Sequence, residues 1–300
     1  RKKARENAPT RATRRPYAGH TRDVRGIYTG ERAMGGRGSS SGNNGGGGGG
    51  GSNGGGGGDS GGGTDPINPN DPTHWTWEQL NTYLSSSNDE DEATTIANAT
   101  SWLKAHQSAE AIPLMDDHMT SSENFYSITT KDNVTVLFTK GNEQNAAMTI
   151  MELAAGYGTL PDALKQSITQ IVMTTETDGP ITATGGTPDN NIVVYGGAPI
   201  STGTLAHEAA HNLALKAWGS PYPPYNEEGT DGYYENGTSD YGAVVNSSEP
   251  PVSDYAKTNG GEDFAEAVKQ YVLNPAELQR IAPLRYAIIH RMMTDPNYHG

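Results

Sequence analysis

Cysteine is absent from this 300-residue chain, and its absence removes several kinds of chemistry at once. The protein can form no disulfide framework, has no thiol nucleophile and cannot hold a metal through cysteine. Long apolar runs are missing as well. No stretch approaches the roughly 18 consecutive apolar residues of a membrane-spanning helix, so the sequence predicts no membrane span.

Basic residues are scarce outside the amino-terminal region. Residues 1–38 hold eleven Lys and Arg against three Asp and Glu, a net of +8, whereas the rest holds ten against 32, a net of −22. Between 35 and 64 the chain is almost entirely Gly, Ser and Asn, which cannot bury a core and should form a flexible coil. We therefore predict a basic disordered tail (1–34), a Gly/Ser/Asn-rich linker (35–74) and a single folded domain (75–300).

The basic tail has two interpretations. Its composition favours a solvated disordered extension of a longer precursor, in keeping with a chain that opens on Arg1. It could instead contact nucleic acid, an anionic membrane or an acidic partner. We expect nucleic-acid binding, if any, only through this tail.

The most informative motif is His207-Glu208-Ala209-Ala210-His211. On a helix this spacing places both imidazoles on one face, where they can share one Zn²⁺, while Glu208 can reach a water held by the metal. Ordinary packed or solvated residues could produce the same pattern. However, apolar neighbours surround the helix almost completely, so it should be buried, and buried histidines and glutamates need partners. The expected burial therefore favours a zinc site over ordinary packed or solvated residues.

A catalytic zinc needs a third protein ligand and an open position for water. The metzincin continuation would need Gly at 214 and His or Asp at 217, and both positions are Ala. The stretch Gly237 to Gly242, which contains Asp240, resembles aspzincins, whose third ligand is an Asp, but the match is two residues short. Asp240 therefore remains an alternative third ligand.

A more specific pattern lies downstream, in Tyr255, Thr258-Asn259 and Glu262-Asp263-Phe264-Ala265-Glu266. Together with HExxH it resembles the gluzincin catalytic domain of the anthrax lethal factor family, which includes secreted Pro-Pro endopeptidases. The resemblance covers about Thr202 to Leu273. It implies that Glu262 is the third zinc ligand, that Glu266 is a buried carboxylate orienting a histidine, and that the Tyr255 hydroxyl points at the metal site.

Glu262 also has an interpretation without a metal. Asn259 is a good N-cap, and a carboxylate three residues later stabilises a helix end by roughly 0.3 to 1 kcal/mol. Glu262, Glu266 and Lys269 share one helical face, which by itself indicates a solvated stripe.

The resemblance implies a zinc-dependent metalloendopeptidase that acts on a protein or peptide substrate. Glu208 would be the general base, and Tyr255 would donate a hydrogen bond to the developing oxyanion. We expect a monomeric catalytic domain that is secreted or exported. The alternative is a protease toxin or effector domain at the end of a larger exported protein. Acidic residues in the connection between Trp218 and Ser253 would either solvate an exposed loop or favour basic substrates; they include Glu227, Glu228, Asp231, Glu235, Asp240 and Glu249.

The predicted fold class is α+β, with a zincin-like core of a small mixed sheet, the active-site helix and a helical carboxy-terminal part. Periodicity predicts helices over 75–84, 93–106, 143–155 and from Pro275, and strands over 134–139, 171–174 and 191–195. The last strand could be the sheet edge on which a peptide is laid. The core of the final helix should comprise Leu278, Ile281, Leu284, Tyr286, Ile288 and Ile289.

Overall fold

The computed structural model describes residues 71–86, 91–115, 119–178, 182–186, 189–220, 223, 239–245 and 247–300. Within them the chain has the predicted α+β class, with one mixed sheet and several helices. The predicted tail and all but the last four residues of the predicted linker lie outside this part. No described helix is long and apolar enough to cross a membrane.

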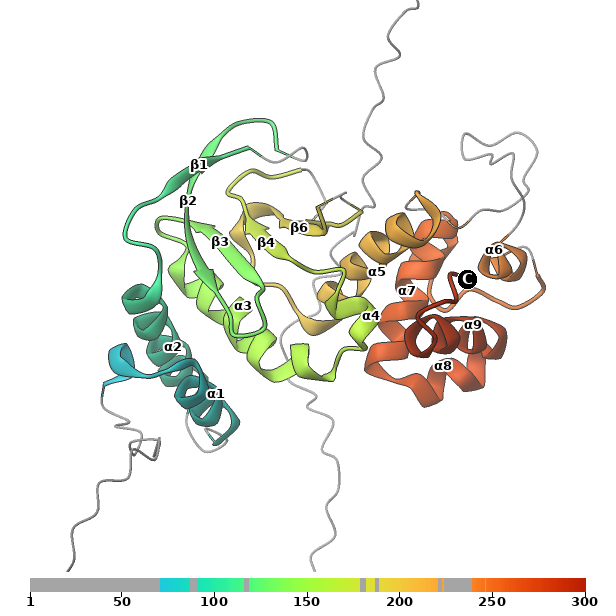
Figure 1. The fold of residues 1–300 in the computed structure, drawn as a ribbon, viewed down its shortest axis with the longest axis horizontal. Coiled ribbons are helices and arrows are strands. Elements are labelled where there is room, and N and C mark those ends of the chain that lie inside the picture. The colour runs from blue at the N-terminus through green and yellow to red at the C-terminus, as the bar shows by residue number, and fades with distance from the viewer. Residues whose placement is uncertain are drawn as a thin grey trace, which may run out of the picture. The chain divides into compact units, whose positions relative to one another are not determined.

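In the described part of the chain, the sheet has six strands in the order β1-β2-β3-β4-β6-β5 (Figure 1). The strands are β1 (Ile112–Leu114), β2 (Glu123–Thr129), β3 (Thr135–Thr139), β4 (Gln170–Met173), β5 (Ala183–Thr184) and β6 (Asn191–Val194). Strands β3, β4 and β6 run parallel to one another, and β1, β2 and β5 join antiparallel. The parallel strands are short apolar runs, as expected for strands buried on both faces.

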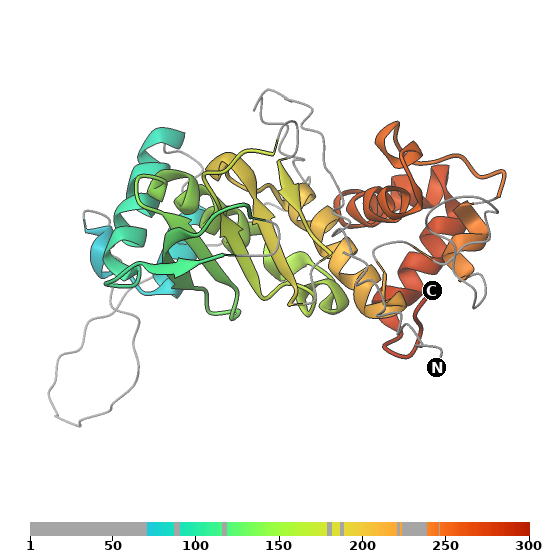
Figure 2. The same cartoon turned by 90° about the horizontal axis from the view of Figure 1, so that it is seen from above.

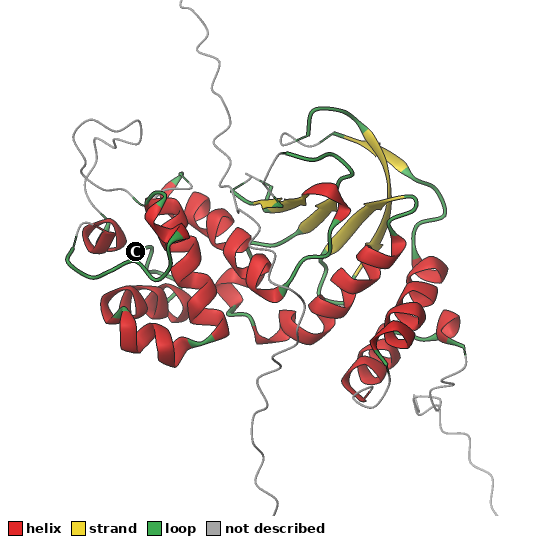
Figure 3. Cartoon of the chain, turned by 180° about the vertical axis from the view of Figure 1, so that it is seen from behind, coloured by secondary structure: helices red, strands yellow, loops and turns green. Residues whose placement is uncertain are grey.

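Each face of the sheet has its own packing. Leu137, Val172 and Val193 are register partners on one face and pack with Met119 and Phe125. The other face carries the helices α3 (Glu143–Gly156) and α5 (Thr202–Trp218), and α1 (Trp77–Ser86) and α2 (Glu92–His106) pack against α3 (Figure 3). Helix α5 therefore packs against one face of the sheet, which holds it in place.

The expected sheet edge is wrong. The strand at 191–195 is β6, and it lies between β4 and β5. Among the described strands the edge next to α5 is β5, which pairs antiparallel with β6 through Ala183 and Thr184. Two residues are too few to show an alternating pattern, so this strand could not be predicted from the sequence.

The carboxy-terminal half is helical and lies on the side of α5 away from the sheet (Figure 2). It contains α6 (Asp240–Val245), α7 (Gly260–Leu273), α8 (Pro275–Ile281) and α9 (Pro283–Thr294). The single helix predicted from Pro275 is broken at Ala282, whose φ of −140° is not helical and which precedes Pro283.

Because of this break, the core predicted for the final helix is wrong in part. Leu278 and Ile289 are fully buried as expected, but Leu284 is 51% exposed and Arg285 is 0% exposed. A helix that restarts at Pro283 turns a different face inward from one that runs on without interruption. The inward position next to Leu284 is therefore taken by an arginine.

Candidate metal centre

Helix α5, which carries the HExxH motif, is fixed at both ends. Ser201 caps its start by accepting a hydrogen bond from Thr204 N at 3.1 Å. Glu152 of α3 accepts hydrogen bonds from Thr202 N at 3.2 Å and from Thr202 Oγ1 at 2.9 Å. Gly219 ends the helix in the left-handed region, at φ +69°.

His207, Glu208 and His211 lie on α5 and are all buried, with exposed fractions of 0%, 0% and 1%. The prediction that this helix is buried is confirmed. Burying three polar side chains costs free energy unless each has a hydrogen-bond or metal partner. The groups around them therefore indicate what the site can bind.

The sheet approaches α5 very closely at this motif. A Cβ on Gly185, directly after β5, would lie 2.2 Å from Glu208 O, so only glycine fits there. Asn212 follows the motif, and its Oδ1 accepts a hydrogen bond from Gly186 N at 2.6 Å while its Nδ2 donates to Asn191 O at 3.2 Å. The edge strand and the motif are thus locked together.

Helix α7 brings the second half of the predicted site. Asn259 caps it as expected, accepting a hydrogen bond from Glu262 N at 2.9 Å. The interpretation of Glu262 and Glu266 as a solvated stripe is wrong, because they are only 2% and 9% exposed. Helix α5 packs against this face and excludes water from it.

Three ligating atoms converge between the two helices. His207 Nε2 lies 3.1 Å from Glu262 Oε2 and 3.3 Å from His211 Nε2, and His211 Nε2 lies 3.5 Å from Glu262 Oε2. Ligands bound about 2.0 to 2.1 Å from a tetrahedral zinc stand about 3.3 Å apart. The three residues therefore fit a zinc ion in both chemistry and spacing.

Glu208 is the competing candidate for the third ligand. His207, Glu208 and His211 have ligand atoms within 4.8 Å of one another. That limit is looser than the spacing of about 3.3 Å that tetrahedral ligands require, and Glu262 meets the tighter requirement for both histidines. By spacing, Glu262 is therefore the better candidate for a third ligand than Glu208.

Glu266 orients His207. Its Oε1 accepts a hydrogen bond from His207 Nδ1 at 3.0 Å and one from Lys269 Nζ at 3.1 Å, and its Oε2 accepts one from Ser253 Oγ at 2.9 Å. Burial would raise the pKa of Glu266, but its contacts with His207 and Lys269 together outweigh burial and hold that pKa at about 2. The carboxylate stays charged and fixes the imidazole ring.

The pKa values of His207 and Glu262 depend on each other. Burial lowers the pKa of His207, but hydrogen bonds with Glu262 and Glu266 outweigh it and raise the pKa to about 9. For Glu262 burial acts upward, and the contacts with His207 and His211 hold its pKa well below the usual range. Glu262 and Glu266 therefore both keep their negative charge beside the histidines.

Tyr255 lies beside this cluster, in the short 3-10 helix η5 (Tyr255–Lys257). Its ring centre is 5.9 Å from that of His207. Burial, followed by the negative charges of Glu262 and Glu208, raises the pKa of Tyr255. The phenol therefore keeps its proton and remains a donor.

Asp240, the alternative third ligand, lies elsewhere. It is exposed at the start of α6, and its carboxylate accepts a hydrogen bond from Tyr298 Oη at 2.6 Å. No cluster of ligating side chains within the described residues includes it. Of the acidic residues expected to select basic substrates, Glu249 contacts the start of α9, and Glu227, Glu228, Asp231 and Glu235 lie outside the described residues.

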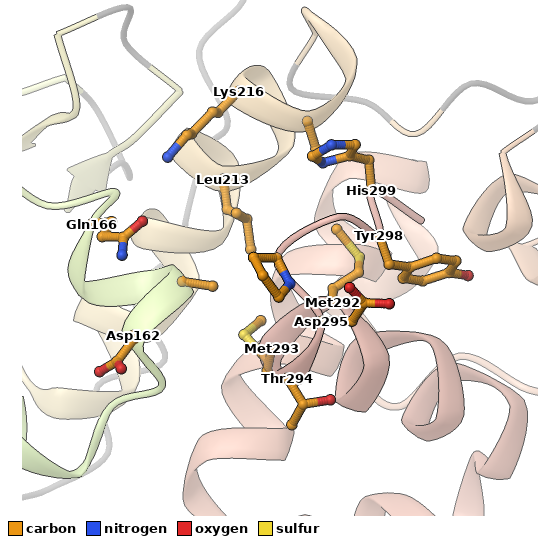
Figure 4. A pocket seen from close by; sticks show the side chains of 13 residues that line it. Asp162, Gln166, Leu213, Lys216, Met292, Met293, Thr294, Asp295, Tyr298 and His299 are labelled. Carbon is orange, nitrogen blue, oxygen red and sulfur yellow. The ribbon is translucent and has the colours of Figure 1, made fainter.

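A pocket of about 340 Å³ lies on another side of α5. Figure 4 shows Lys216 and Leu213 of α5 facing Gln166 and Met292 across it. At about 100° per residue, Leu213 and Lys216 point away from the direction of the two histidines. This pocket is therefore separate from the candidate metal centre.

Sequence reasoning missed several residues that support the site. Ser253 and Asn212 are polar residues whose buried hydrogen bonds no short motif predicts. Arg285 could have been noticed as a cation inside an otherwise apolar pattern. Models of known protein families and curated proteins give no match to this chain. The resemblance to the lethal factor family, and the export that it implies, stay predictions.

Proposed function

We propose that this chain is a zinc-dependent endopeptidase of the gluzincin type. The observation that carries the proposal is the convergence of His207 Nε2, His211 Nε2 and Glu262 Oε2 at mutual distances of 3.1 to 3.5 Å. These residues would hold Zn²⁺, with Glu208 and Tyr255 beside them. The substrate is a protein or peptide.

Zinc, when bound, supplies Lewis acidity that polarises a peptide carbonyl and makes water acidic near neutral pH. Glu208 is the general base that takes the proton of the attacking water, and it returns that proton to the leaving amine nitrogen. Tyr255 donates its hydroxyl proton in a hydrogen bond to the carbonyl oxygen as negative charge grows there, a contribution of about 3 kcal/mol when preorganised.

The supporting residues act through the histidines. Glu266 accepts the Nδ1 proton of His207, so in the neutral ring, the form that ligates a metal, the Nε2 lone pair is directed between the helices. Ser253 and Lys269 hold Glu266 in turn. This chain of hydrogen bonds sets the tautomer and the ring orientation on which ligation depends.

The sheet edge supports a peptide substrate. Strand β5 is the described edge strand beside α5, and Gly185 places its end directly against Glu208 O. A peptide added antiparallel to an edge strand would be held by backbone hydrogen bonds in an extended form. Such a peptide would pass the catalytic base.

The test compares the wild type with Glu208→Gln and Glu262→Ala, measuring bound zinc and cleavage of a peptide library with and without a zinc chelator. We expect Glu208→Gln to keep zinc and lose cleavage, because the base is removed while the ligands stay. Glu262→Ala should lose most of its zinc, since one of three ligands is gone.

Glu78→Gln, on exposed α1, is the control that should behave as the wild type. Cleavage that survives the chelator, or full activity in either site variant, would overturn the proposal.

A further inference from the structure

A second buried cluster of charges lies next to the candidate metal centre and takes no part in the proposed reaction. Arg285 of α9 is 0% exposed and Asp263 of α7 is 2% exposed. Arg285 Nε donates to Asp263 Oδ1 at 2.7 Å, and Nη2 donates to Oδ2 at 2.8 Å. This two-point pairing fixes the carboxylate in both position and plane.

The cluster connects three helices. Tyr241 of α6 donates its hydroxyl to Asp263 Oδ1 at 2.7 Å. Arg285 Nη1 donates to Glu249 O at 3.2 Å, and the Glu249 carboxylate accepts hydrogen bonds from Leu284 N and Arg285 N at the start of α9. Helices α6, α7 and α9 therefore meet at one carboxylate, that of Asp263.

Burial makes this arrangement expensive as a source of stability. A buried ion pair is often no more stabilising than apolar residues of similar volume, because both charges lose their hydration. Such a pair can instead define a unique geometry, and here the geometry that it defines is next to a candidate ligand. Asp263 directly follows Glu262 in the first turn of α7.

Adjacent residues on a helix point about 100° apart, so the direction of one fixes the direction of the other. With Asp263 held by Arg285 and Tyr241, the first turn of α7 cannot rotate about its axis. Glu262 is thereby aimed at the Nε2 atoms of His207 and His211.

We propose that Arg285 and Tyr241 are positioning residues that set zinc affinity by fixing Glu262 through Asp263. This inference rests on the proposed function, since it concerns the same zinc site. It assigns a role to residues of α6 and α9 that touch neither histidine.

The experiment measures the dissociation constant for Zn²⁺ by competition with a chelating dye, and the unfolding temperature of the zinc-free protein. Arg285→Lys keeps the charge but loses the two-point pairing, and Tyr241→Phe removes a single hydroxyl. We expect zinc binding to weaken about tenfold in Arg285→Lys, the low end of the range for residues behind a metal ligand, and less, about threefold, in Tyr241→Phe, which loses one hydrogen bond.

Matched controls remove the same groups elsewhere. Arg280→Lys alters an exposed pair with Glu277 on α8, and Tyr271→Phe removes a hydroxyl of α7 that contacts His290. Both should bind zinc as the wild type does.

Two outcomes overturn the inference. If Tyr241→Phe and Arg285→Lys lower the unfolding temperature but bind zinc with unchanged affinity, the cluster only stabilises the fold. If Arg285→Lys does not fold, Tyr241→Phe alone decides between these results. A wild type that binds no zinc overturns the proposed function itself, and the inference with it.

Discussion

Carboxylates are held differently in the two halves that flank α5. In the sheet half they accept hydrogen bonds from hydroxyls and backbone N–H groups; these carboxylates are Glu123, Glu152 and Glu176. In the helical half Asp263 and Glu266 also accept hydrogen bonds from hydroxyls, but each pairs in addition with a cation or an imidazole.

The difference shows how each half positions its part of the site. Helix α5 is located by apolar packing, a close backbone contact at Gly185 and the amide of Asn212. Helix α7 is located by charge as well as packing. Salt screens the partly exposed pair of Lys269 with Glu266 but does not weaken close packing, so the two halves should respond differently to added salt.

The largest expected effect breaks the sheet side. Gly185→Ala places a Cβ 2.2 Å from Glu208 O, so backbone must shift. We expect a loss of about 3 kcal/mol of unfolding free energy, equal at low and high salt, measured by urea denaturation. Gly158→Ala is the control, since nothing lies within 4 Å of a Cβ there. Equal losses in both variants would remove the argument from close approach.

A smaller effect tests the neutral donors. Glu176 accepts hydrogen bonds from Ser121 Oγ at 2.6 Å and from Thr120 N at 2.9 Å. The Ser121 hydroxyl, then the Thr120 amide, lower the pKa of Glu176 from 4.5 to about 2. Because the folded pKa is depressed, its stabilisation is present above pH 4.5 and is lost as the pH falls towards 2.

Glu176→Gln should therefore be less stable than the wild type at pH 7 and match it near pH 2. We expect a difference of about 1 kcal/mol at pH 7, reduced by solvent screening, from urea denaturation across this pH range. Glu110→Gln, on an exposed turn, should show no such convergence. A pH-independent difference for Glu176→Gln would contradict the role of its charge.

The smallest effect tests the charged side. Lys269 contacts Glu266 at 3.1 Å and is partly exposed. Lys269→Ala should cost about 0.5 kcal/mol at low salt and less in 1 M salt, because the pair is screened. Lys257→Ala removes a more exposed lysine, which also lies three residues after its partner in the sequence, Asp254. This change should affect stability less. An effect of Lys269→Ala that salt leaves unchanged would argue for packing of its stem instead.

The longer helices could be predicted from their periodicity, and the parallel strands from their short runs of apolar residues. Helix α2 begins at Glu92, one residue from the predicted start, and β3 covers 135–139 within the predicted 134–139. Strand β2 was missed because only Phe125 and Ile128 among its seven residues are buried. Its pairing with β3, rather than its own pattern, makes it a strand.

The residues of the candidate site also fall into those that local sequence predicts and those that depend on packing. The spacing of His207 and His211 follows from one helix, so local sequence is sufficient to predict their shared face. The approach of Glu262 depends on how α7 packs against α5, and it was reached only through a family resemblance. Arg285 was missed because the break at Ala282 changes which face of α9 turns inward.

That break also makes chain length a constraint. Asn274 caps α8 and Pro283 begins α9, so the number of residues between them determines where α9 starts and which of its side chains turn inward. Inserting or deleting one residue within α9 before Arg285 would turn the rest of that helix by about 100° and present a neighbouring side chain to Asp263. Substitutions on the surface of α8 should be tolerated far better than any change in its length.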